Sequence, residues 1–300
     1  MTAEWFPMSR GLDHVVHAVR DLDAAADLYR RLGFTVGARN RHSWGTHNRI
    51  VQLPGFFIAL VTVAEPERLG TDTFSALFGT FNRIFLQRHE GLSFLMLESA
   101  DAVADAAAFR AAGIGVTDAT GYEREGVRPD GTTVKIAFSN AFARDAKAPD
   151  IGFAACQQHY PENFWHPEFQ QHANTANSVA GVVLVAENPS DHHIFLSAFT
   201  GERELQATSS GVTAPTPRGD IRVMDPAAFQ DHFGIVPPDV SRSARLAALR
   251  FNVRDQAALH ATLTAGRIAF SSHIAGTVIG PETAMGATLV FETSLGIANR

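Results

Sequence analysis

His14 lies in a short, largely apolar segment at the start of residues 12–34, LDHVVHAVRDLDAAADLYRRLGF. The alternation of this segment predicts a strand that carries His14 and Val16 on one face and Val15 and His17 on the other. A neutral imidazole can ligate a divalent metal or act as a general base. A lone histidine on a strand also commonly makes a structural hydrogen bond, so both roles stay open for His14.

Two polar, aromatic segments could complete a site around His14. Residues 39–47, RNRHSWGTH, place two histidines on either side of a tryptophan in a glycine-containing loop. Residues 156–169, CQQHYPENFWHPEF, have the same character and no regular periodicity. Such side chains can orient substrate oxygens and stack on aromatic rings, although they can equally serve loop packing. The candidate catalytic residues are His14 and His159, and the candidate substrate-binding residues are Trp44, His47, Asn48, Gln158 and Trp165.

The rest of the chain offers little other chemistry. It contains no GxSxG nucleophile elbow, no phosphate-binding loop and no GxGxxG dinucleotide motif. The single cysteine, Cys156, excludes an intramolecular disulfide and a multi-cysteine metal cluster. It lies on an apolar predicted strand, and His159 would point to the opposite face of that strand. We therefore expect a buried structural thiol at Cys156 rather than a nucleophile.

Length and composition indicate a globular protein. The 300 residues make one large domain or two, and 45% hydrophobic with 19% charged residues can build a sizeable core. The net charge of −6 does not favour a nucleic-acid or anionic-membrane surface. No apolar run approaches the roughly 18 residues of a membrane span, and the first residues lack a signal-peptide core. We expect a cytoplasmic protein whose partner is a small-molecule ligand.

The opening strand and helix recur along the chain. The apolar strand, the acidic turn at Asp21, the amphipathic helix and the closing Gly33 return without a gap in residues 92–114, and more faintly in residues 179–201 and 246–266. Short strand-like segments follow each copy, so the repeated unit is a strand, a helix and three strands. Two such units side by side make a curved sheet around a cavity. The predicted fold class is α+β, with four βαβββ modules paired into two curved-sheet half-barrels.

Three further expectations follow from the pattern. Residues 34–36 are expected to form a strand directly after the first helix. An aromatic stripe at helical spacing predicts a core-facing helix over residues 72–90. The polar stretch QHANTANS separates an N-terminal module pair, residues 1–172, from a C-terminal pair, residues 178–300.

These features resemble the vicinal oxygen chelate superfamily, which includes glyoxalase I and the extradiol ring-cleavage dioxygenases. Within it, the chain is most similar to the glyoxalase-like domain family of mostly uncharacterised bacterial proteins. The similarity is carried by GLDHVVHAVRDLDAAADLYRRLGF (11–34), WGTHN (44–48) and CQQHYPENFWHPEFQQH (156–172). It covers residues 10–190 well, and the C-terminal third matches only as a general module.

The resemblance implies a divalent metal on the cavity floor, held by His and Glu from the first and last strands of paired modules. Fe, Mn, Ni or Zn would suit such ligands. His14 occupies the first-strand position, whereas the second copy carries Phe94 there. Ala59 stands where the family tends to carry glutamate, and Lys135 lies near the corresponding place in the second module. Glu292 lies on the final strand, and no histidine partner accompanies it.

A standard three-ligand metal site is therefore not expected in either half. An unusual site remains open, in which His14 is completed by His47, Gln158 or His159. The sequence assigns no certain cofactor, and the enzyme hypothesis requires either a metal or a base poised in the cavity.

Two classes of function remain open. The first is an enzyme of the glyoxalase lyase or isomerase type, or a ring-cleavage dioxygenase, with His14 as ligand or base. The second is a non-catalytic binding or sequestering protein on the same fold, whose stacking surface would be supplied by Trp44, Phe56, Phe57 and Trp165. A third use of the fold is pairing of sheet faces, and an exposed sheet edge would invite a homodimer.

Overall fold

The computed structural model describes residues 9–70, 72–127 and 131–293. The first module comprises β1 (Leu12–Ala18), α1 (Leu22–Arg31), β2 (Asn40–Arg41), β3 (Thr46–Leu53) and β4 (Phe56–Val63). The second comprises β5 (Gly91–Glu98), α3 (Ala102–Ala111), β6 (Thr120–Val127), β7 (Thr133–Ala143) and β8 (Gly152–Gln158). The third comprises β9 (Ala176–Val185), α4 (His193–Thr200), β10 (Gln206–Thr208), β11 (Gly211–Pro215) and β12 (Asp220–Met224). The fourth comprises β13 (Arg245–Val253), α6 (Gln256–Ala265), β14 (Ser271–His273), β15 (Gly276–Ile279) and β16 (Thr288–Thr293).

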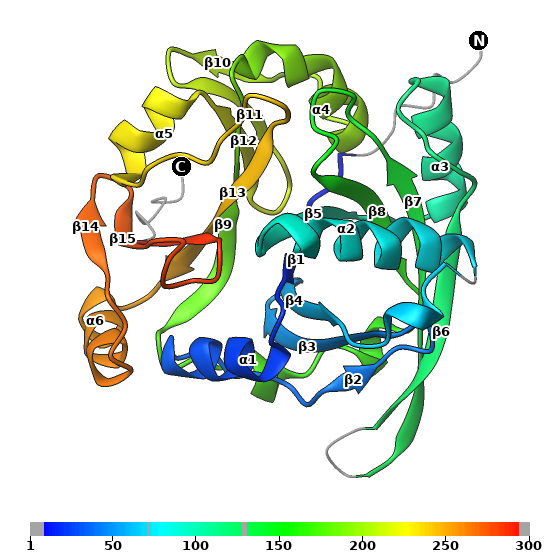
Figure 1. Ribbon diagram of the computed structural model, residues 1–300, viewed down its shortest axis with the longest axis horizontal. Helices are drawn as coiled ribbons and strands as arrows, with labels where there is room; N and C mark the ends of the chain where they lie inside the picture. The colour runs from blue at the N-terminus through cyan, green and yellow to red at the C-terminus, as the bar shows by residue number, and fades with distance from the viewer. Residues whose placement is uncertain (1–8, 71, 128–130, 294–300) are drawn as a thin grey trace, which may run out of the picture.

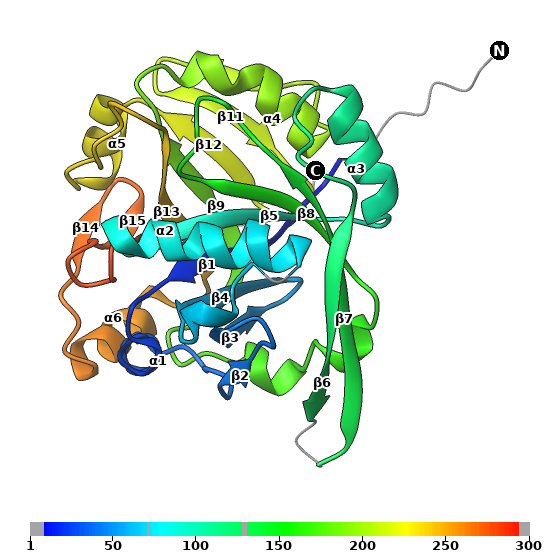
Figure 2. The same cartoon turned by 45° about the vertical axis from the view of Figure 1, so that its right-hand side comes forward.

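The four predicted βαβββ modules are confirmed, and they form two eight-stranded mixed sheets (Figure 1). The N-terminal sheet has the order β2-β3-β4-β1-β5-β8-β7-β6, and the C-terminal sheet repeats it as β10-β11-β12-β9-β13-β16-β15-β14. Within each module the first and last strands are parallel, as β1 and β4 are. Two modules join through antiparallel first strands, as β1 and β5 do. The N-terminal sheet curls into a half-barrel, and the hairpin of β6 and β7 forms its long edge (Figure 2).

Helix starts follow the repeated acidic turn. Asp21 accepts hydrogen bonds from the first free amides of α1, and Asp101 and Asp255 do the same for α3 and α6. Gly33, after α1, has the left-handed φ of 86° that its position at the helix end predicts. In the fourth module Arg267 takes this conformation instead, at a φ of 54°. The glycine before it permits close approach of two helices, because a Cβ there would lie 2.1 Å from the carbonyl oxygen of Arg31 in α1.

The largest apolar cluster lies between the two sheets and takes residues from both. Phe34 exemplifies it, because its ring contacts Tyr29 of the first module and Phe251 and Phe291 of the fourth. The N-terminal sheet takes its strands from residues 12–158 and the C-terminal sheet from 176–293. The predicted division of the chain into domains at 172 and 178 stays a prediction, since this core is shared.

A helix covers the inner face of each sheet. Above the N-terminal sheet, a π-helical turn (Ser75–Thr80) leads into α2 (Phe81–Arg88), which agrees with the predicted core-facing helix. Phe78 and Phe81 pack on Phe94 of β5, at 5.2 and 4.7 Å between ring centroids. Above the C-terminal sheet the corresponding cover is α5 (Pro226–Phe233). The described residues also contain short 3-10 turns at Pro66–Arg68, Pro161–Asn163, Pro167–Gln170 and Pro189–His192.

Three local predictions were wrong. Residues 34–36 do not form a strand, because Phe34 is inserted into the shared core instead of lying in a ladder. The first strand after α1 is the short β2, inside the segment expected to be a loop. Lys135 does not lie on the last strand of the second module: that strand is β8, and Lys135 lies on β7, where it is exposed and pairs with Glu123 at 2.6 Å. No helix of the described residues is long and apolar enough to span a membrane.

Candidate functional site

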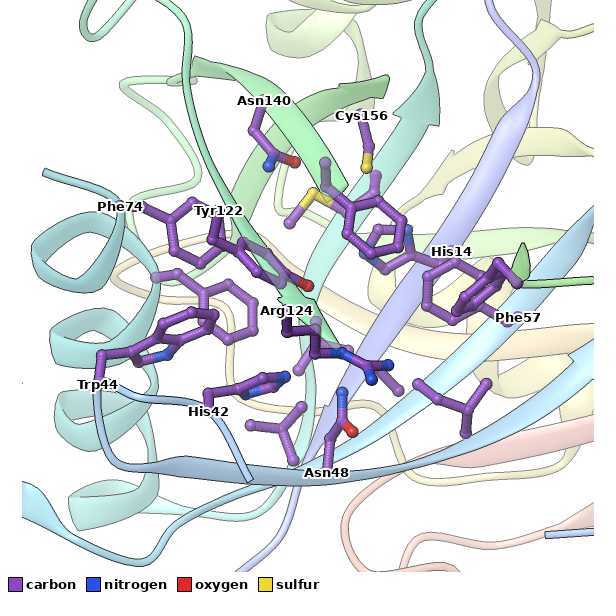
Figure 3. Close-up of a pocket in the computed structure, with 18 residues that line it drawn as sticks. His14, His42, Trp44, Asn48, Phe57, Phe74, Tyr122, Arg124, Asn140 and Cys156 are labelled. Carbon is purple, nitrogen blue, oxygen red and sulfur yellow. The ribbon is translucent and has the colours of Figure 1, made fainter. Parts of the chain in front are cut away.

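A partly enclosed, largely aromatic cavity lies between the inner face of the N-terminal sheet and the helix above it (Figure 3). The cavity volume open to the centres of water molecules is ≈ 40 Å³. This volume holds about three waters, which occupy roughly 100 Å³ in the liquid. A second hollow of ≈ 140 Å³ on the same measure lies beside it and shares Ile50, Arg124 and Phe164 with it. The rings that line the inner cavity are mainly those of Phe57, Phe74, Phe78, Tyr122, Phe138 and Phe164.

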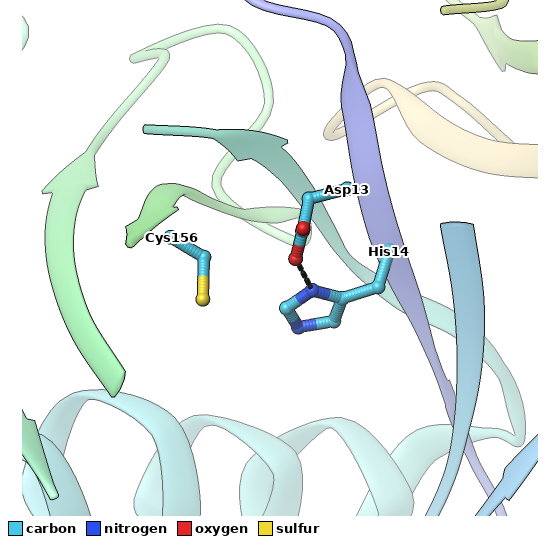
Figure 4. Close-up of side chains that lie close together, drawn as sticks. All are labelled: Asp13, His14 and Cys156. Atoms are coloured by element: carbon cyan, nitrogen blue, oxygen red, sulfur yellow. Dashed lines mark hydrogen bonds and ion pairs between the residues drawn. The ribbon is translucent and has the colours of Figure 1, made fainter. Parts of the chain in front are cut away.

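His14 lines this cavity from β1, and Asp13 holds its ring (Figure 4). The Oδ2 atom of Asp13 lies 2.5 Å from Nδ1 of His14, and the His14 ring stacks on Phe57 with centroids 4.1 Å apart. A carboxylate only accepts, so this contact assigns the proton to Nδ1 and leaves Nε2 as the acceptor of the neutral ring. Among the described residues, Nε2 of His14 has no hydrogen-bond partner.

A β-bulge allows the two neighbouring side chains to meet. Leu12 pairs with Leu97 and His14 with Met96, so two residues of β1 oppose one residue of β5 at this point. Strand alternation would have sent Asp13 to the other face, and sequence reasoning therefore missed it. The sequence did carry a signal, because Asp13 lies inside a segment that must be buried. A buried carboxylate requires a partner.

Two further groups surround Asp13. Gln158 donates from Nε2 to Oδ1 of Asp13 at 2.8 Å, so both carboxylate oxygens are engaged. Cys156 lines the cavity from β8 and is 3% exposed. Burial, and then the charge of Asp13, raise the pKa of the Cys156 thiol well above its ordinary value. The thiol is therefore protonated at neutral pH, in agreement with a structural rather than a nucleophilic cysteine.

The opposite wall carries polar groups from β3, β6 and the loop between β2 and β3 (Figure 3). Asn48 lines the cavity, and its Oδ1 accepts from Nδ2 of Asn40 at 2.9 Å. His42 and Trp44 stack in parallel, with centroids 4.4 Å apart, and both are 5% exposed. Burial, and next the nearby charge of Arg124, lower the pKa of His42 to about 3, so this imidazole is neutral.

The candidate residues do not all gather in the cavity. His14, Trp44 and Asn48 line it, and Gln158 contacts Asp13, the residue that holds the His14 ring. His159 lies outside, exposed at the end of β8, where its ring pairs with Ser139 at 2.8 Å above a separate open hollow. The structure therefore does not bring His159 to His14.

Three other aromatic or histidine candidates also lie away from the cavity wall. His47 is buried and its Nε2 lies 3.1 Å from Glu65, while its Nδ1 has no partner among the described residues. Trp165 packs behind the wall, against Phe57 at 5.9 Å. Phe56 points to the opposite face of β4, into the shared core. The stacking surface is thus formed by Trp44 and Phe57 with rings that the sequence did not single out.

The side chains around His14 decide whether this site fits the divalent metal that the fold suggests. Ligand atoms of Asp13, His14 and Cys156 lie within 4.8 Å of one another. Nε2 of His14 could supply one ligand, because metal-bound histidines commonly donate their other ring N–H to a carboxylate. However, both oxygens of Asp13 are already engaged, one by His14 and the other by Gln158. The neighbouring inward position Ala59 carries no ligand atom. These residues form a hydrogen-bonded group and do not fit a three-ligand metal site.

In the C-terminal sheet an arginine occupies the comparable inner face. Arg250 of β13 is 3% exposed and donates to Glu292 from Nε at 2.5 Å and from Nη2 at 3.0 Å, and it also pairs with Asp220. The guanidinium thus neutralises the carboxylate of Glu292 that the sequence left without a partner. Position 248, which corresponds to His14, is an alanine.

The comparisons with solved structures agree with this fold. A hypothetical protein from Staphylococcus aureus is similar over 95% of this chain and 99% of its own, with a TM-score of 0.66 and 12% identity. A triple mutant of 4-hydroxymandelate synthase from Streptomyces coelicolor is similar over 87% of this chain and 76% of its own, with a TM-score of 0.52 and 14% identity. A xylose isomerase-like TIM barrel/4-hydroxyphenylpyruvate dioxygenase fusion protein matches 98% of this chain and 50% of its own, with a TM-score of 0.52 and 14% identity.

These likenesses establish the architecture. Identities this low carry no further information about the chemistry. The sequence has no significant match among curated proteins. A family model described as "glyoxalase-like domain" matches residues 12–200. This match covers more than half of the chain and includes all of the cavity residues. The repeated modules, the curled sheet and this match lead to one assignment: the chain belongs to the glyoxalase-like domain family.

Proposed function

We propose that the N-terminal cavity binds and transforms a small, partly aromatic oxygenated molecule by proton transfer, with His14 as the general base. The observation that carries this proposal is the pair of Asp13 and His14 at the wall of an aromatic cavity, with Nε2 of His14 free of any described partner. An orienting carboxylate on one ring nitrogen leaves the other poised to take a proton.

The step is a proton abstraction next to a carbonyl group. A C–H bond of the ligand breaks, the proton moves to Nε2 of His14, and the electron pair forms the carbon–carbon double bond of an enolate. Asp13 stabilises the imidazolium that results, through the Nδ1 contact. Returning the proton to the same or a neighbouring atom completes an exchange or an isomerisation, with no oxidant and no net loss of atoms.

Two neutral donors of the cavity are suited to the enolate oxygen. Burial raises the pKa of the Tyr122 hydroxyl far above its ordinary value, so this group keeps its proton and can donate it. Asn140 of β7 lines the cavity and is 2% exposed, and it offers an amide donor (Figure 3). Donors fixed in a buried wall stabilise developing charge more than water does, because they need no reorganisation.

Cavity blocking tests whether the ligand binds there. Ala59 lines the cavity and is 5% exposed, so Ala59→Leu should fill part of the free volume. We expect phenylpyruvate to quench tryptophan fluorescence of the wild type, and Ala59→Leu to weaken its binding at least about tenfold. Ala247→Leu, on the inner face of the C-terminal sheet, is the matched control. Equal binding by wild type and Ala59→Leu, at matched melting temperatures, would place the ligand elsewhere.

A second candidate is ligand binding without turnover. The specific observation in its favour is that the inward positions Ala59 and Phe94, where a ligand-bearing residue would be expected, carry none. Metal analysis of protein purified without added metal separates the routes. Stoichiometric metal that is lost in His14→Ala would contradict the metal-free base, and tight aromatic binding with no proton exchange would favour the binding protein.

A further inference from the structure

The cavity wall opposite His14 contains buried donors that have no acceptor. Trp44 can only donate from Nε1, it is 5% exposed, and Nε1 has no partner among the described residues. Nε of Arg124 is likewise buried and unpartnered. Buried donors are almost always paired in folded proteins, so orphaned donors on two residues that line one cavity indicate a missing acceptor.

Arg124 adds a charge that the described residues do not neutralise. Its guanidinium donates from Nη1 to the backbone oxygen of Glu125 at 3.1 Å, and no carboxylate of the described residues forms an ion pair with it. Its strand neighbours Glu123 and Glu125 are exposed on the other face of β6. Burial lowers the pKa of Arg124 from its ordinary value, yet a guanidinium stays charged in proteins. A partly buried cation without a counter-ion is costly, and an anionic ligand would remove this cost.

The neighbouring polar groups also present donors. Asn40 occupies Oδ1 of Asn48, so the amide nitrogen of Asn48 is the end left for a ligand. In Figure 3 this nitrogen and the Tyr122 hydroxyl point toward the guanidinium of Arg124. Arginine and amide donors together form a fork that suits the two oxygens of a carboxylate.

The size of the cavity limits the rest of the ligand. Free volume of roughly 100 Å³ of liquid accepts about one ring, and the rings around it provide flat apolar contacts. Arg124 also lines the adjoining hollow, so a carboxylate bound to it would lie where the two spaces meet.

We propose that Arg124, with Asn48, forms a carboxylate-binding subsite, and that the ligand of this cavity is a small aromatic carboxylic acid. This inference rests on the proposed function, because it names the substrate class of the same cavity. The acid group would anchor one end of the ligand at Arg124 and direct the other end toward His14.

Benzoate and benzamide test the subsite, since the two molecules have nearly the same shape and differ in charge. Calorimetric titration of the full chain at low ionic strength should show benzoate binding at least about tenfold more tightly than benzamide. Arg124→Gln should remove this preference, and Arg124→Lys should retain part of it. Arg110→Gln is the control, because Arg110 is exposed and pairs with Asp118 far from the cavity wall.

Three outcomes would overturn the subsite: no benzoate binding at millimolar concentration, equal binding of benzoate and benzamide, or undiminished benzoate binding by a folded Arg124→Gln. The subsite and the general base fail separately. Benzoate selectivity that depends on Arg124, in a protein that exchanges no proton, would support the subsite and contradict the base. Proton exchange that depends on His14 but not on Arg124 would support the base and contradict the subsite.

Discussion

Asp13 and His14 are consecutive residues whose side chains nevertheless meet, with Oδ2 and Nδ1 2.5 Å apart. The β-bulge in β1 makes this contact possible. The same irregularity recurs in β13, between Leu246 and Ala248, where alanines replace both polar residues. The bulge is therefore part of the repeated scaffold, and only the first module uses it to hold an imidazole.

The tautomer of His14 should depend on Asp13. In the wild type, the carboxylate should hold the proton on Nδ1, because an ionised acceptor favours the donor that faces it. Asp13→Ala should give a mixture of both neutral tautomers, visible in the ¹⁵N chemical shifts of the His14 ring at neutral pH. Identical ¹⁵N shifts in wild type and variant would mean that Asp13 does not orient the ring. His17 is the internal reference, since Tyr29 and the Met285 carbonyl hold its ring.

Cys156 should be inert in the folded protein. Burial keeps its thiol protonated and out of contact with reagents. Reaction with 5,5′-dithiobis(2-nitrobenzoate) at pH 8 should be slower in the native protein than in urea by a factor on the order of 10² or more. Labelling of the native protein at the unfolded rate would contradict the structural role, and Cys156→Ala provides the blank.

His42 should make folding stability sensitive to acid. Its pKa is about 3 in the folded state because of burial and the charge of Arg124, against 6.5 ordinarily. Below pH 6.5 His42 is protonated in the unfolded state and stays neutral in the folded state. Its contribution to the free energy of unfolding is therefore complete above pH 6.5 and is lost as the pH falls toward 3. Because of this residue, the free energy of unfolding of the wild type should fall by about 1.4 kcal/mol per pH unit, or by about 2 kcal/mol at pH 5. Urea unfolding of wild type and His42→Gln checks it, and parallel pH curves for the two proteins would refute it.

Arg250 should be a major stabilising residue of the C-terminal sheet. Arg250→Met leaves Glu292 without its cation and Asp220 with only the partly exposed Arg222, and breaking a buried pair from one side costs about 3 kcal/mol or more. Arg110→Ala breaks an exposed pair on α3 and should cost no more than about 0.5 kcal/mol. Urea unfolding measures both, and similar free energies of unfolding for the two variants would contradict the interpretation of Arg250.

The repeated scaffold could be predicted from sequence because its signals are local. Strand alternation, the capping aspartates and Gly33 each act within a few residues, and three helices begin at the expected aspartate. Phe34 shows the limit of this reasoning: its tertiary contact with Phe251 outweighs the local preference for a strand.

The cavity could be predicted only in part. His14, Trp44 and Asn48 were recognised by residue type, and the structure brings them to one cavity. Asp13 was missed because a bulge changes the face of one residue without a sequence rule to announce it. Arg124 was missed because it lies in a hairpin of alternating polar residues that reads as exposed, and only the curl of the sheet brings its inner face over the cavity.

Proton exchange tests the central claim most directly. Phenylpyruvate in D₂O, with a chelator present, should lose its C3 protons faster with the wild type than with His14→Gln, by a factor on the order of 10²–10⁴ in ¹H NMR spectra. His159→Gln is the matched control, because His159 lies outside the cavity. The account predicts that His159→Gln exchanges at the wild-type rate. Equal exchange by wild type and a folded His14→Gln that still binds phenylpyruvate would contradict His14 as the base.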